Sequence, residues 1–401
     1  MTLLLFWGGA LVVGYTYVGF PLLVLLRARL RPRPHTIADI TPRVSVVIAA
    51  HDEMAAIGPR VDNLLALDYP PDRLEIVIAS DGSTDGTVAT AEAHGGDRVR
   101  VLDLPRVGKA TALNRAVESS TGEVLVFSDA NTAYAPDAVR SLVRSFADPE
   151  VGGVAGNQVY LAVSDSNGVI DPGAATAAGV GERSYWDLDR VIKEAESLGG
   201  NVISATGAIY ALRRELFQPV PDGVTDDFVT STRVIAQGRR LVFDAGAVAL
   251  EPVAGSGRRE YRRKVRIMTR GLRGVAVARS LLDPRRHGFY SVQLLTHKVL
   301  RRLMAVPLLG IAISSPLLWA AGPIYQVATV GQVVVYGLGG VGLALRDQPA
   351  GRRPWFAIPA FFCLVNIASL HALANLVSGR RIDRWEPARR VEDAAATEGD
   401  A

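Results

Sequence analysis

The segment Val44–Glu53, VSVVIAAHDE, decides the fold class of this chain. Its first part, Val44–Ala50, is a β-branched apolar run, which is typical of a strand buried on both faces of a sheet. Three more strands are expected after it, with helical patterns between them: Leu74–Ser80, Val99–Leu104 and Glu123–Phe127. This alternation predicts an α/β fold, a doubly wound mixed sheet that is mostly parallel, with helices on both faces.

Polar side chains follow three of these strands, at the point where each strand ends. They are His51-Asp52-Glu53, Asp81-Gly82-Ser83 and Ser128-Asp129-Ala130-Asn131. Sheets of this kind bind ligands beyond the carboxyl ends of their strands. Any one of these groups could be an ordinary turn or helix cap, because Asp, Ser and Thr form local hydrogen bonds there. Three loops that bring acids to one edge predict a ligand site.

The loop after the first strand excludes the commonest nucleotide-binding motifs. AAHDEMAA, residues 49–56, has no glycine-rich turn that would bring backbone amides to a dinucleotide pyrophosphate. Gly108-Lys109 lacks the rest of a phosphate-loop signature. An acidic edge instead suits a nucleotide bound through a divalent metal.

The composition argues against several other kinds of partner and site. The chain has 401 residues, of which 49% are hydrophobic, and a formal net charge of +4. No nucleic-acid partner is expected, because the arginines lie in clusters beside apolar runs rather than along one helix. The single cysteine, Cys363, excludes an internal disulfide, and the dispersed histidines predict no zinc site.

Apolar stretches at both ends predict a multi-pass protein of the cell membrane. Leu3–Leu26 is longer than the roughly 20 residues that a helix needs to cross a bilayer, and an arginine cluster follows it at 27–33. Such a cluster predicts that the next domain is cytoplasmic. We expect a transmembrane helix over 1–26, a basic linker over 27–42, a cytoplasmic domain over 43–274, an amphipathic interfacial segment over 275–302, a membrane region of two or three spans over 303–378, and a polar tail over 379–401.

The last apolar segment, Trp355–Val377, raises a question of topology. Arginines precede it at 346, 352 and 353, and five more follow it between 380 and 390. Both flanks cannot be cytoplasmic if the segment crosses the bilayer fully. Either this segment is re-entrant or interfacial, or the charge rule fails on one side.

Four motifs in a fixed order resemble glycosyltransferase family 2, the inverting enzymes that use nucleotide-activated sugars. They are VSVVIAAHDE, IASDGSTDGT, GKATALNRAVESSTGEVLVFSDANT and GVTDDF. The resemblance covers roughly Arg43–Gly274, and the apolar flanks resemble the membrane-bound branch with the synthases of cellulose, chitin, hyaluronan and poly-N-acetylglucosamine. It implies a glycosyltransferase A-type fold, a nucleotide-sugar donor, a divalent cation (Mg²⁺ or Mn²⁺), a lipid-linked or polysaccharide acceptor, and contact with membrane lipids.

The resemblance assigns five polar residues to the donor. Asp52 and Glu53 match acids that line the nucleotide pocket, and Asp81 matches the residue that contacts the base or ribose. Lys109 and Asn114 match the helix that helps to close the nucleoside site.

The same resemblance implies a metal site at the end of the fourth strand. Asp129 matches the first acid of an Asp-x-Asp metal motif, and Asn131 replaces the second acid with an uncharged oxygen. One carboxylate can suffice for Mg²⁺ when phosphates and water complete its shell, so it stays open whether Asn131 is a ligand. Gly207, in SATGAIYALRR, matches the segment beneath the junction of sugar and acceptor.

Asp226-Asp227 stands where the family has Glu-Asp, whose second acid is the catalytic base. The acceptor hydroxyl needs a positioned base when it attacks the anomeric carbon, and a single displacement inverts that carbon. The resemblance therefore implies that Asp227 is the base and that Asp226 supports the acceptor or Asp227. The alternative is an N-cap pair before a helix over Phe228–Gln237.

A basic segment follows the expected base. Arg263-Lys264-Val265-Arg266-Ile267 stands where membrane synthases carry Gln-x-x-Arg-Trp. Arg266 matches the arginine and would clamp the departing diphosphate, with Arg263 also near the substrate. The Gln and Trp are missing, which leaves open whether synthesis is processive. The alternative is a basic interfacial helix beside anionic lipid.

Three functions therefore compete. The first is a membrane-bound inverting glycosyltransferase with a lipid-linked or polysaccharide acceptor. The second is an enzyme that transfers one sugar to a membrane lipid, which the degraded Gln-x-x-Arg-Trp motif favours. The third is a catalytically inactive membrane scaffold, which the presence of both candidate acids argues against.

Overall fold

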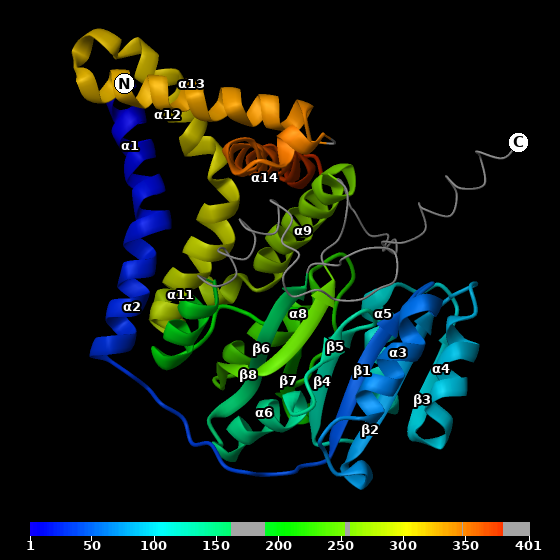
Figure 1. Ribbon diagram of the computed structural model, residues 1–401. Coiled ribbons are helices and arrows are strands. Elements are labelled where there is room, and N and C mark those ends of the chain that lie inside the picture. The colour runs from blue at the N-terminus through cyan, green and yellow to red at the C-terminus, as the bar shows by residue number, and fades with distance from the viewer. Residues whose placement is uncertain (162–188, 253–256, 347, 380–401) are drawn as a thin grey trace, which may run out of the picture. The chain divides into compact units, whose positions relative to one another are not determined.

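The computed structural model describes residues 1–161, 189–252, 257–346 and 348–379 (Figure 1). The chain divides into two compact units. The helical unit contains Met1–Arg33 and the described parts of Leu161–Ile203 and Gly255–Ile382, and the sheet unit contains Pro34–Tyr160 and Ser204–Ala254.

The sheet unit is built on one mixed sheet. Its strands, in the order β3-β2-β1-β4-β7-β6-β8-β5, are β1 Val44–Ala50, β2 Leu74–Asp81, β3 Val99–Leu104, β4 Val124–Asp129, β5 Ala133–Tyr134, β6 Val151–Leu161, β7 Tyr210–Arg213 and β8 Arg240–Pro252. The strands from β3 to β4 pair in parallel, whereas β7 pairs antiparallel with both β4 and β6. In the parallel part, Ala49 lies opposite both Ala79 and Asp129, so these strands end at one level.

Helices cover both faces of the sheet. They are α3 Met54–Leu65, α4 Thr87–Gly95, α5 Lys109–Ser119, α6 Ala138–Arg144 and α8 Asp226–Ala236, with 3₁₀ turns at Pro71–Arg73, Gly96–Arg98, Ser145–Ala147 and Arg214–Leu216. Alternate β1 residues, from Val44 to Ala50, pack in one core with α3, α4 and α6. Helix α5 also contacts β1 and β2 but has no residue in that core. All of β1 is buried, as its composition predicted, because its other face is covered too.

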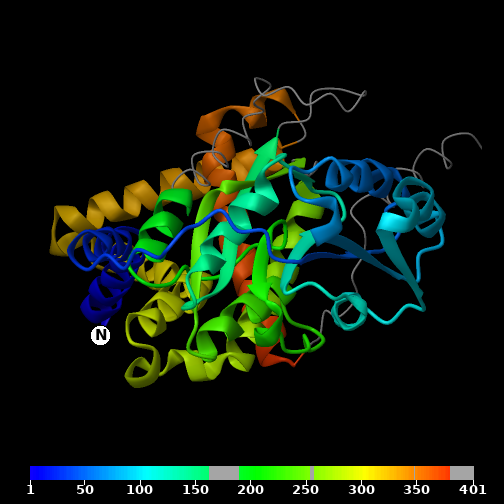
Figure 2. The same cartoon turned by 90° about the horizontal axis from the view of Figure 1, so that it is seen from below.

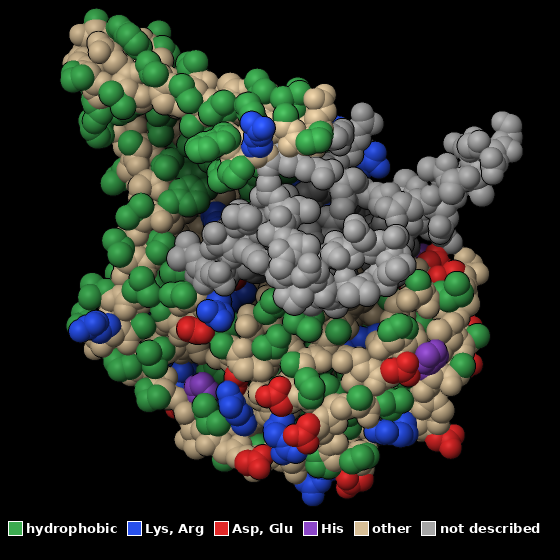
Figure 3. Space-filling view, in the orientation of Figure 1, with side chains coloured by type: hydrophobic (Ala, Val, Ile, Leu, Met, Phe, Trp, Pro, Cys, Tyr) green, Lys and Arg blue, Asp and Glu red, His purple; other side chains and the backbone are tan. Residues whose placement is uncertain are grey.

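The helical unit contains long apolar helices. Its elements are α1 Thr2–Gly14, a π-helical turn Tyr15–Gly19, α2 Phe20–Leu30, a helix over 189–198, α9 Gly257–Val277, α10 Pro284–His287, α11 Phe289–Leu294, a π-helical turn Leu295–Val299, α12 Ala305–Leu317, α13 Pro323–Ala344 and α14 Pro354–Val377, with 3₁₀ turns at Arg279–Leu282, Leu300–Leu303, Trp319–Ala321 and Pro349–Arg352. Among the described residues, Thr2–Leu30, α13 and α14 are long and apolar enough to cross a membrane. Hydrophobic side chains cover the surface of these helices (Figure 3). The chain is therefore a membrane protein by length and composition of its helices.

A bent pair of helices forms a fourth candidate span. Phe289–Leu303 and Ala305–Leu317 meet at 52°, and we call them together the bent pair. This pair runs antiparallel to Thr2–Leu30: Tyr15 bonds Thr296 (Oη to Oγ1, 3.2 Å), and Gly9 lies against Ile311. Figure 1 shows α12 beside α1, and both lie within the helical unit.

The units differ from the domain limits expected from the sequence. Helix α9, which lies within the expected domain 43–274, belongs to the helical unit, together with the helix over 189–198. The segment expected as the polar tail lies beyond the described residues except for Gly379. The sequence-based limits stay predictions.

Candidate active site

The carboxyl ends of β1, β2 and β4 bring three acidic loops to one edge of the sheet unit, as the sequence predicted. Figure 2 shows the sheet from below, with the parallel strands side by side. Strand β4 extends through Ser128 to Asp129, two residues further than expected, because Ile48 and Ala49 of β1 still pair with them. Asp129 therefore stands at the end of a paired strand, with its side chain 34% exposed.

Lys109 connects the two acidic segments that are far apart in the sequence. It is the first residue of α5, and its Nζ lies 2.9 Å from Asp129 Oδ1 and 3.2 Å from Asp226 Oδ2. Burial lowers the pKa of Lys109, but the charges of Asp129 and Asp226 outweigh it and raise that pKa above its ordinary value. Lys109 is therefore an ammonium ion at any physiological pH and holds both carboxylates in place.

Asp226 and Asp227 begin helix α8. The N-cap is Thr225, so the two acids occupy the first turn, and the alternative of an N-cap pair before Phe228 is wrong. Negative charge in the first turn is stabilised by the helix dipole. Asp227 Oδ1 accepts a hydrogen bond from the Phe228 amide at 2.7 Å, which fixes the orientation of its carboxylate.

Gly207 leaves space beside Asp129. A Cβ atom at position 207 would lie 3.0 Å from Asp129 Oδ2, which is closer than nearly all Cβ contacts in proteins. Asp129 thus has one oxygen bound to Lys109 and a second that faces an open backbone position. In the described part of the chain, no three His, Cys, Asp or Glu side chains come together to hold a metal by themselves. One carboxylate with an accessible oxygen fits a hard cation that phosphates and water also coordinate.

Asp81 organises the loop that leads to Lys109. Its carboxylate is completely buried, and Oδ1 accepts hydrogen bonds from the amides of Val107 at 2.6 Å and Gly108 at 2.7 Å. Oδ2 lies 3.6 Å from Arg106 Nη1 and accepts no hydrogen bond within the described residues. Asp81 therefore fixes the backbone of the loop that leads to Lys109.

Asp52 and Glu53 connect the loops after β1 and β2. Asp52 is the only described non-glycine residue with positive φ, 51°. Its Oδ1 accepts a hydrogen bond from the Thr84 amide at 2.8 Å, and the Glu53 amide donates to Thr87 Oγ1 at 2.9 Å. A strained backbone that is held by two loops is typical of binding sites.

A family comparison identifies this domain. The family model of glycosyl transferase family 2 matches residues 45–220, which include β1 to β4 and the acidic edge. The chain carries a family 2 glycosyltransferase domain. The resemblance stated from the motifs is confirmed.

Two curated relatives are similar to part of this chain. The poly-beta-1,6-N-acetyl-D-glucosamine synthase of Staphylococcus aureus is 26% identical over 226 residues, which are 55% of this chain and 52% of that protein. The beta-monoglucosyldiacylglycerol synthase of a Nostoc species is 32% identical over 166 residues, which are 40% of this chain and 35% of that protein. The chain spans about half the length of the first of these relatives.

A solved structure shows the same fold. The structure of a mannosyltransferase from Pyrobaculum calidifontis, in complex with GDP-Man and Mn²⁺, matches with a TM-score of 0.67 at 24% identity, over 94% of this chain and 100% of that one. This likeness confirms the predicted α/β fold of the glycosyltransferase A type.

The remaining predicted site residues are Asn114, Asn131, Arg263 and Arg266. The side-chain amide of Asn114 both donates to the carbonyl of Val220 and accepts from its amide, at 3.0 and 2.8 Å, so it fastens the segment before α8. Asn131 is exposed in the turn after β4. Arg263 and Arg266 lie on α9, in the helical unit. The roles of these residues stay predictions.

Sequence reasoning missed the buried support beneath Asp129. Arg60 of α3 is 3% exposed and donates to Ser128 Oγ at 2.7 Å, and its guanidinium lies 4.1 Å from the centre of the Tyr134 ring. Burial lowers the pKa of Arg60 to about 10. A signal was present, because Arg60 is a charged residue on the apolar stripe that Ile57, Val61 and Leu64 form.

Proposed function

We propose that the protein is a membrane-bound, inverting glycosyltransferase that moves a sugar from a nucleotide-sugar donor to a lipid-linked or polysaccharide acceptor. The observation that carries this proposal is the bridge that Lys109 forms between Asp129 and Asp226 beside the open position at Gly207. It places two carboxylates of separate segments around one point at the ligand-binding edge of a glycosyltransferase fold.

Asp129 would hold a divalent cation, which would neutralise the charge that develops on the diphosphate leaving group. The nucleotide-sugar complex of the Pyrobaculum mannosyltransferase contains Mn²⁺, which supports a cation of this kind. Asp81 and the loops of Asp52 and Glu53 would receive the nucleoside, since they lie at the ends of the adjacent strands.

Asp227 would remove the proton of the acceptor hydroxyl. Asp226 is held in an ion pair with the Lys109 ammonium, at 3.2 Å. The carboxylate of Asp227 is only half-buried and is oriented by the Phe228 amide, so an acceptor can reach it. Attack from the side opposite the leaving diphosphate then inverts the anomeric carbon.

A single transfer to a membrane lipid is the second candidate. The 32% identity to a beta-monoglucosyldiacylglycerol synthase favours it, as does Ile267 in the place of the family tryptophan. The similarity to poly-N-acetylglucosamine synthases favours a polysaccharide product instead.

The test is a donor panel with the purified full chain in detergent. UDP- and GDP-linked sugars are incubated with Mn²⁺ or Mg²⁺, and release of the nucleoside diphosphate is measured with diacylglycerol or a lipid-linked saccharide as acceptor. We expect turnover with at least one donor and loss of turnover on chelation. No turnover with any donor would refute the proposal and favour an inactive scaffold, whereas product size separates one transfer from polymerisation.

A further inference from the structure

The end of the first membrane helix has two different faces. Phe20, Val24 and Ala28 of α2 are buried against Ile192 and Ala195 of the helix over 189–198. Another stripe, made of residues 23, 26, 27, 30 and 31, follows the i, i+3, i+4 spacing of a single helix face. The leucines of this second stripe are between 39% and 67% exposed, so this part of the face is open to a ligand.

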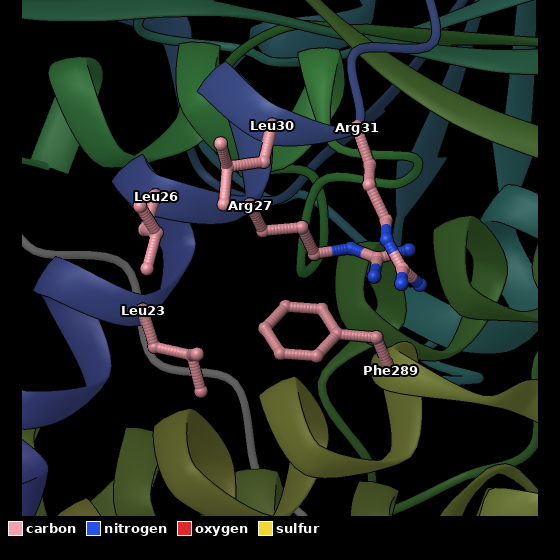
Figure 4. Close-up of a pocket in the computed structure, with 6 residues that line it drawn as sticks. All are labelled: Leu23, Leu26, Arg27, Leu30, Arg31 and Phe289. Carbon is pink, nitrogen blue, oxygen red and sulfur yellow. The ribbon is translucent and has the colours of Figure 1, made fainter.

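A pocket lies along this second stripe. It has a volume of about 170 Å³ and is lined by Leu23, Leu26, Arg27, Leu30, Arg31 and Phe289. Figure 4 shows the two guanidinium groups side by side, with the Phe289 ring beneath that of Arg27 and the leucines along the same helix. The pocket therefore has an apolar wall next to a doubly positive end.

Among the residues that the structure describes, no carboxylate balances the positive end. Arg27 donates from Nε to the carbonyl of Gly199 at 3.2 Å, and its guanidinium lies 4.6 Å from the centre of the Phe289 ring. Neither Arg27 nor Arg31 forms an ion pair with any Asp or Glu that the structure describes. Two adjacent guanidiniums repel each other, so an anion between them is favoured, and a phosphate accepts hydrogen bonds from both.

The length of the helix sets the depth of this pocket in a bilayer. Thr2–Leu30 has 29 residues, or about 44 Å at helical rise. The hydrocarbon core of a bilayer is about 30 Å thick. The last turns of α2, with Arg27 and Arg31, therefore reach the layer of the lipid phosphates, while Leu23 and Leu26 remain next to the acyl chains.

We propose that this pocket is a binding site for one anionic phospholipid. Its headgroup phosphate binds Arg27 and Arg31, and one acyl chain lies along Leu23, Leu26 and Leu30. A free phosphate would use the same two arginines but not the leucines. The site is distinct from the acidic edge of the sheet unit and is independent of sugar transfer.

The test measures lipid binding to the full chain in detergent by native mass spectrometry. Dioleoylphosphatidylglycerol is compared with dioleoylphosphatidylcholine, which has no net charge. We expect the phosphatidylglycerol to bind at least tenfold more tightly, and Arg27→Gln and Arg31→Gln each to lower that preference about fivefold. Arg29→Gln removes the same charge from the same helix end but outside the pocket, and we expect it to leave the preference unchanged.

Further experiments distinguish a bound lipid from a bound free phosphate and check that each variant is folded. Leu26→Gln keeps both arginines and should weaken phosphatidylglycerol binding severalfold, and excess inorganic phosphate should not displace the lipid. Thermal unfolding of each variant, compared with the unchanged chain, shows that the helical unit is intact. Equal binding of both lipids, an equal effect of Arg29→Gln, or displacement by phosphate would each overturn the proposal.

Discussion

Lys109 places a lasting positive charge between Asp129 and Asp226. Its folded-state pKa lies above that of a free lysine, so the stabilisation from its charge is fully present below the ordinary lysine pKa and is lost only at still higher pH. Lys109 therefore does not titrate in the range where the enzyme would work. Under the proposed mechanism, a fall in activity on acidification would come from protonation of a carboxylate, since Asp227 must be ionised to act as the base.

Asp227→Asn tests the assignment of the base. The amide keeps the size of the side chain but cannot take a proton, so we expect the turnover number to fall by about 10²–10⁴ with no change in donor affinity. Turnover is measured as diphosphate release and affinity by calorimetry with the nucleoside diphosphate and Mn²⁺. Asp222→Asn, at an exposed position of the preceding loop, is the matched control. Retained turnover in Asp227→Asn would remove this residue from the role.

Gly207→Ala tests the space beside Asp129. The added Cβ would lie 3.0 Å from Oδ2, and it would displace the carboxylate or block access to that oxygen. We expect the Mn²⁺ concentration for half-maximal donor binding to rise about tenfold, since a well-made carboxylate contact is worth roughly that factor. Gly337→Ala is the control, because its Cβ meets open space. An unchanged Mn²⁺ requirement would show that Oδ2 does not bind the metal.

Arg60→Met tests whether the buried Arg60 side chain supports turnover or only the stability of the fold. The folded-state pKa of Arg60 is lowered to about 10, so burying its charge costs free energy at every pH below that value. An apolar side chain of similar length should therefore leave the melting temperature unchanged or raise it by a few degrees. We expect turnover to fall about tenfold, because Ser128 loses the bond that fixes the end of β4. A large drop in melting temperature with normal turnover would mean that Arg60 serves only the fold.

At the scale of secondary structure, local pattern predicted the parallel strands well. The third strand has the expected bounds, Val99–Leu104. Strand β4 begins one residue later than expected, at Val124, and ends two residues later because the polar Ser128 and Asp129 still pair with β1. The antiparallel strands β6 to β8 were not predicted. In β6, VGGVAGNQVYL, glycines interrupt the apolar pattern, and Gly152 is required because a Cβ would lie 2.5 Å from Leu216. That requirement comes from tertiary packing, which no local pattern contains.

The loop between β3 and α5 depends on a single buried carboxylate. In Asp81→Ala the amides of Val107 and Gly108 lose their acceptor, and we expect a loss of about 2–4 kcal/mol in local stability, since bonds to a charged group are worth about 1.5–3 kcal/mol each. Hydrogen exchange over residues 105–112 should accelerate, and turnover should fall because Lys109 begins the next helix. Asp103→Ala, at an exposed position of β3, is the control. Unchanged exchange in Asp81→Ala would show that the loop is held by other contacts.

At the scale of the whole molecule, the candidate site depends on long-range contacts that motifs could only imply. Lys109 and Asp226 are more than one hundred residues apart in the sequence and meet because β7 pairs with β4 and brings α8 to the edge. The resemblance named both residues but gave them separate roles. Their direct contact, and the support from Arg60, became visible only in the folded chain.

The membrane topology of the segments after the bent pair depends on whether this pair crosses the bilayer. Its contacts with Thr2–Leu30 extend along most of that helix, from Arg27 at Phe289, through Tyr15 at Thr296, to Gly9 at Ile311. Two antiparallel helices in contact over this length occupy the same depth of a bilayer, so we expect the bent pair to cross it as a fourth span. Arg346, after α13, would then face the cytoplasm, as the charge rule requires.

Accessibility of introduced cysteines tests this topology. In a Cys363→Ala background, Ala320→Cys lies in the exposed turn after α12, and Asp72→Cys lies at an exposed position of the sheet unit. A membrane-impermeant maleimide should label Ala320→Cys in right-side-out vesicles and Asp72→Cys only in inverted ones, because the bent pair carries the chain across the bilayer between them. If both cysteines react from the same side, the bent pair is re-entrant, and the arginines that follow α14, rather than Arg346, are the cytoplasmic flank.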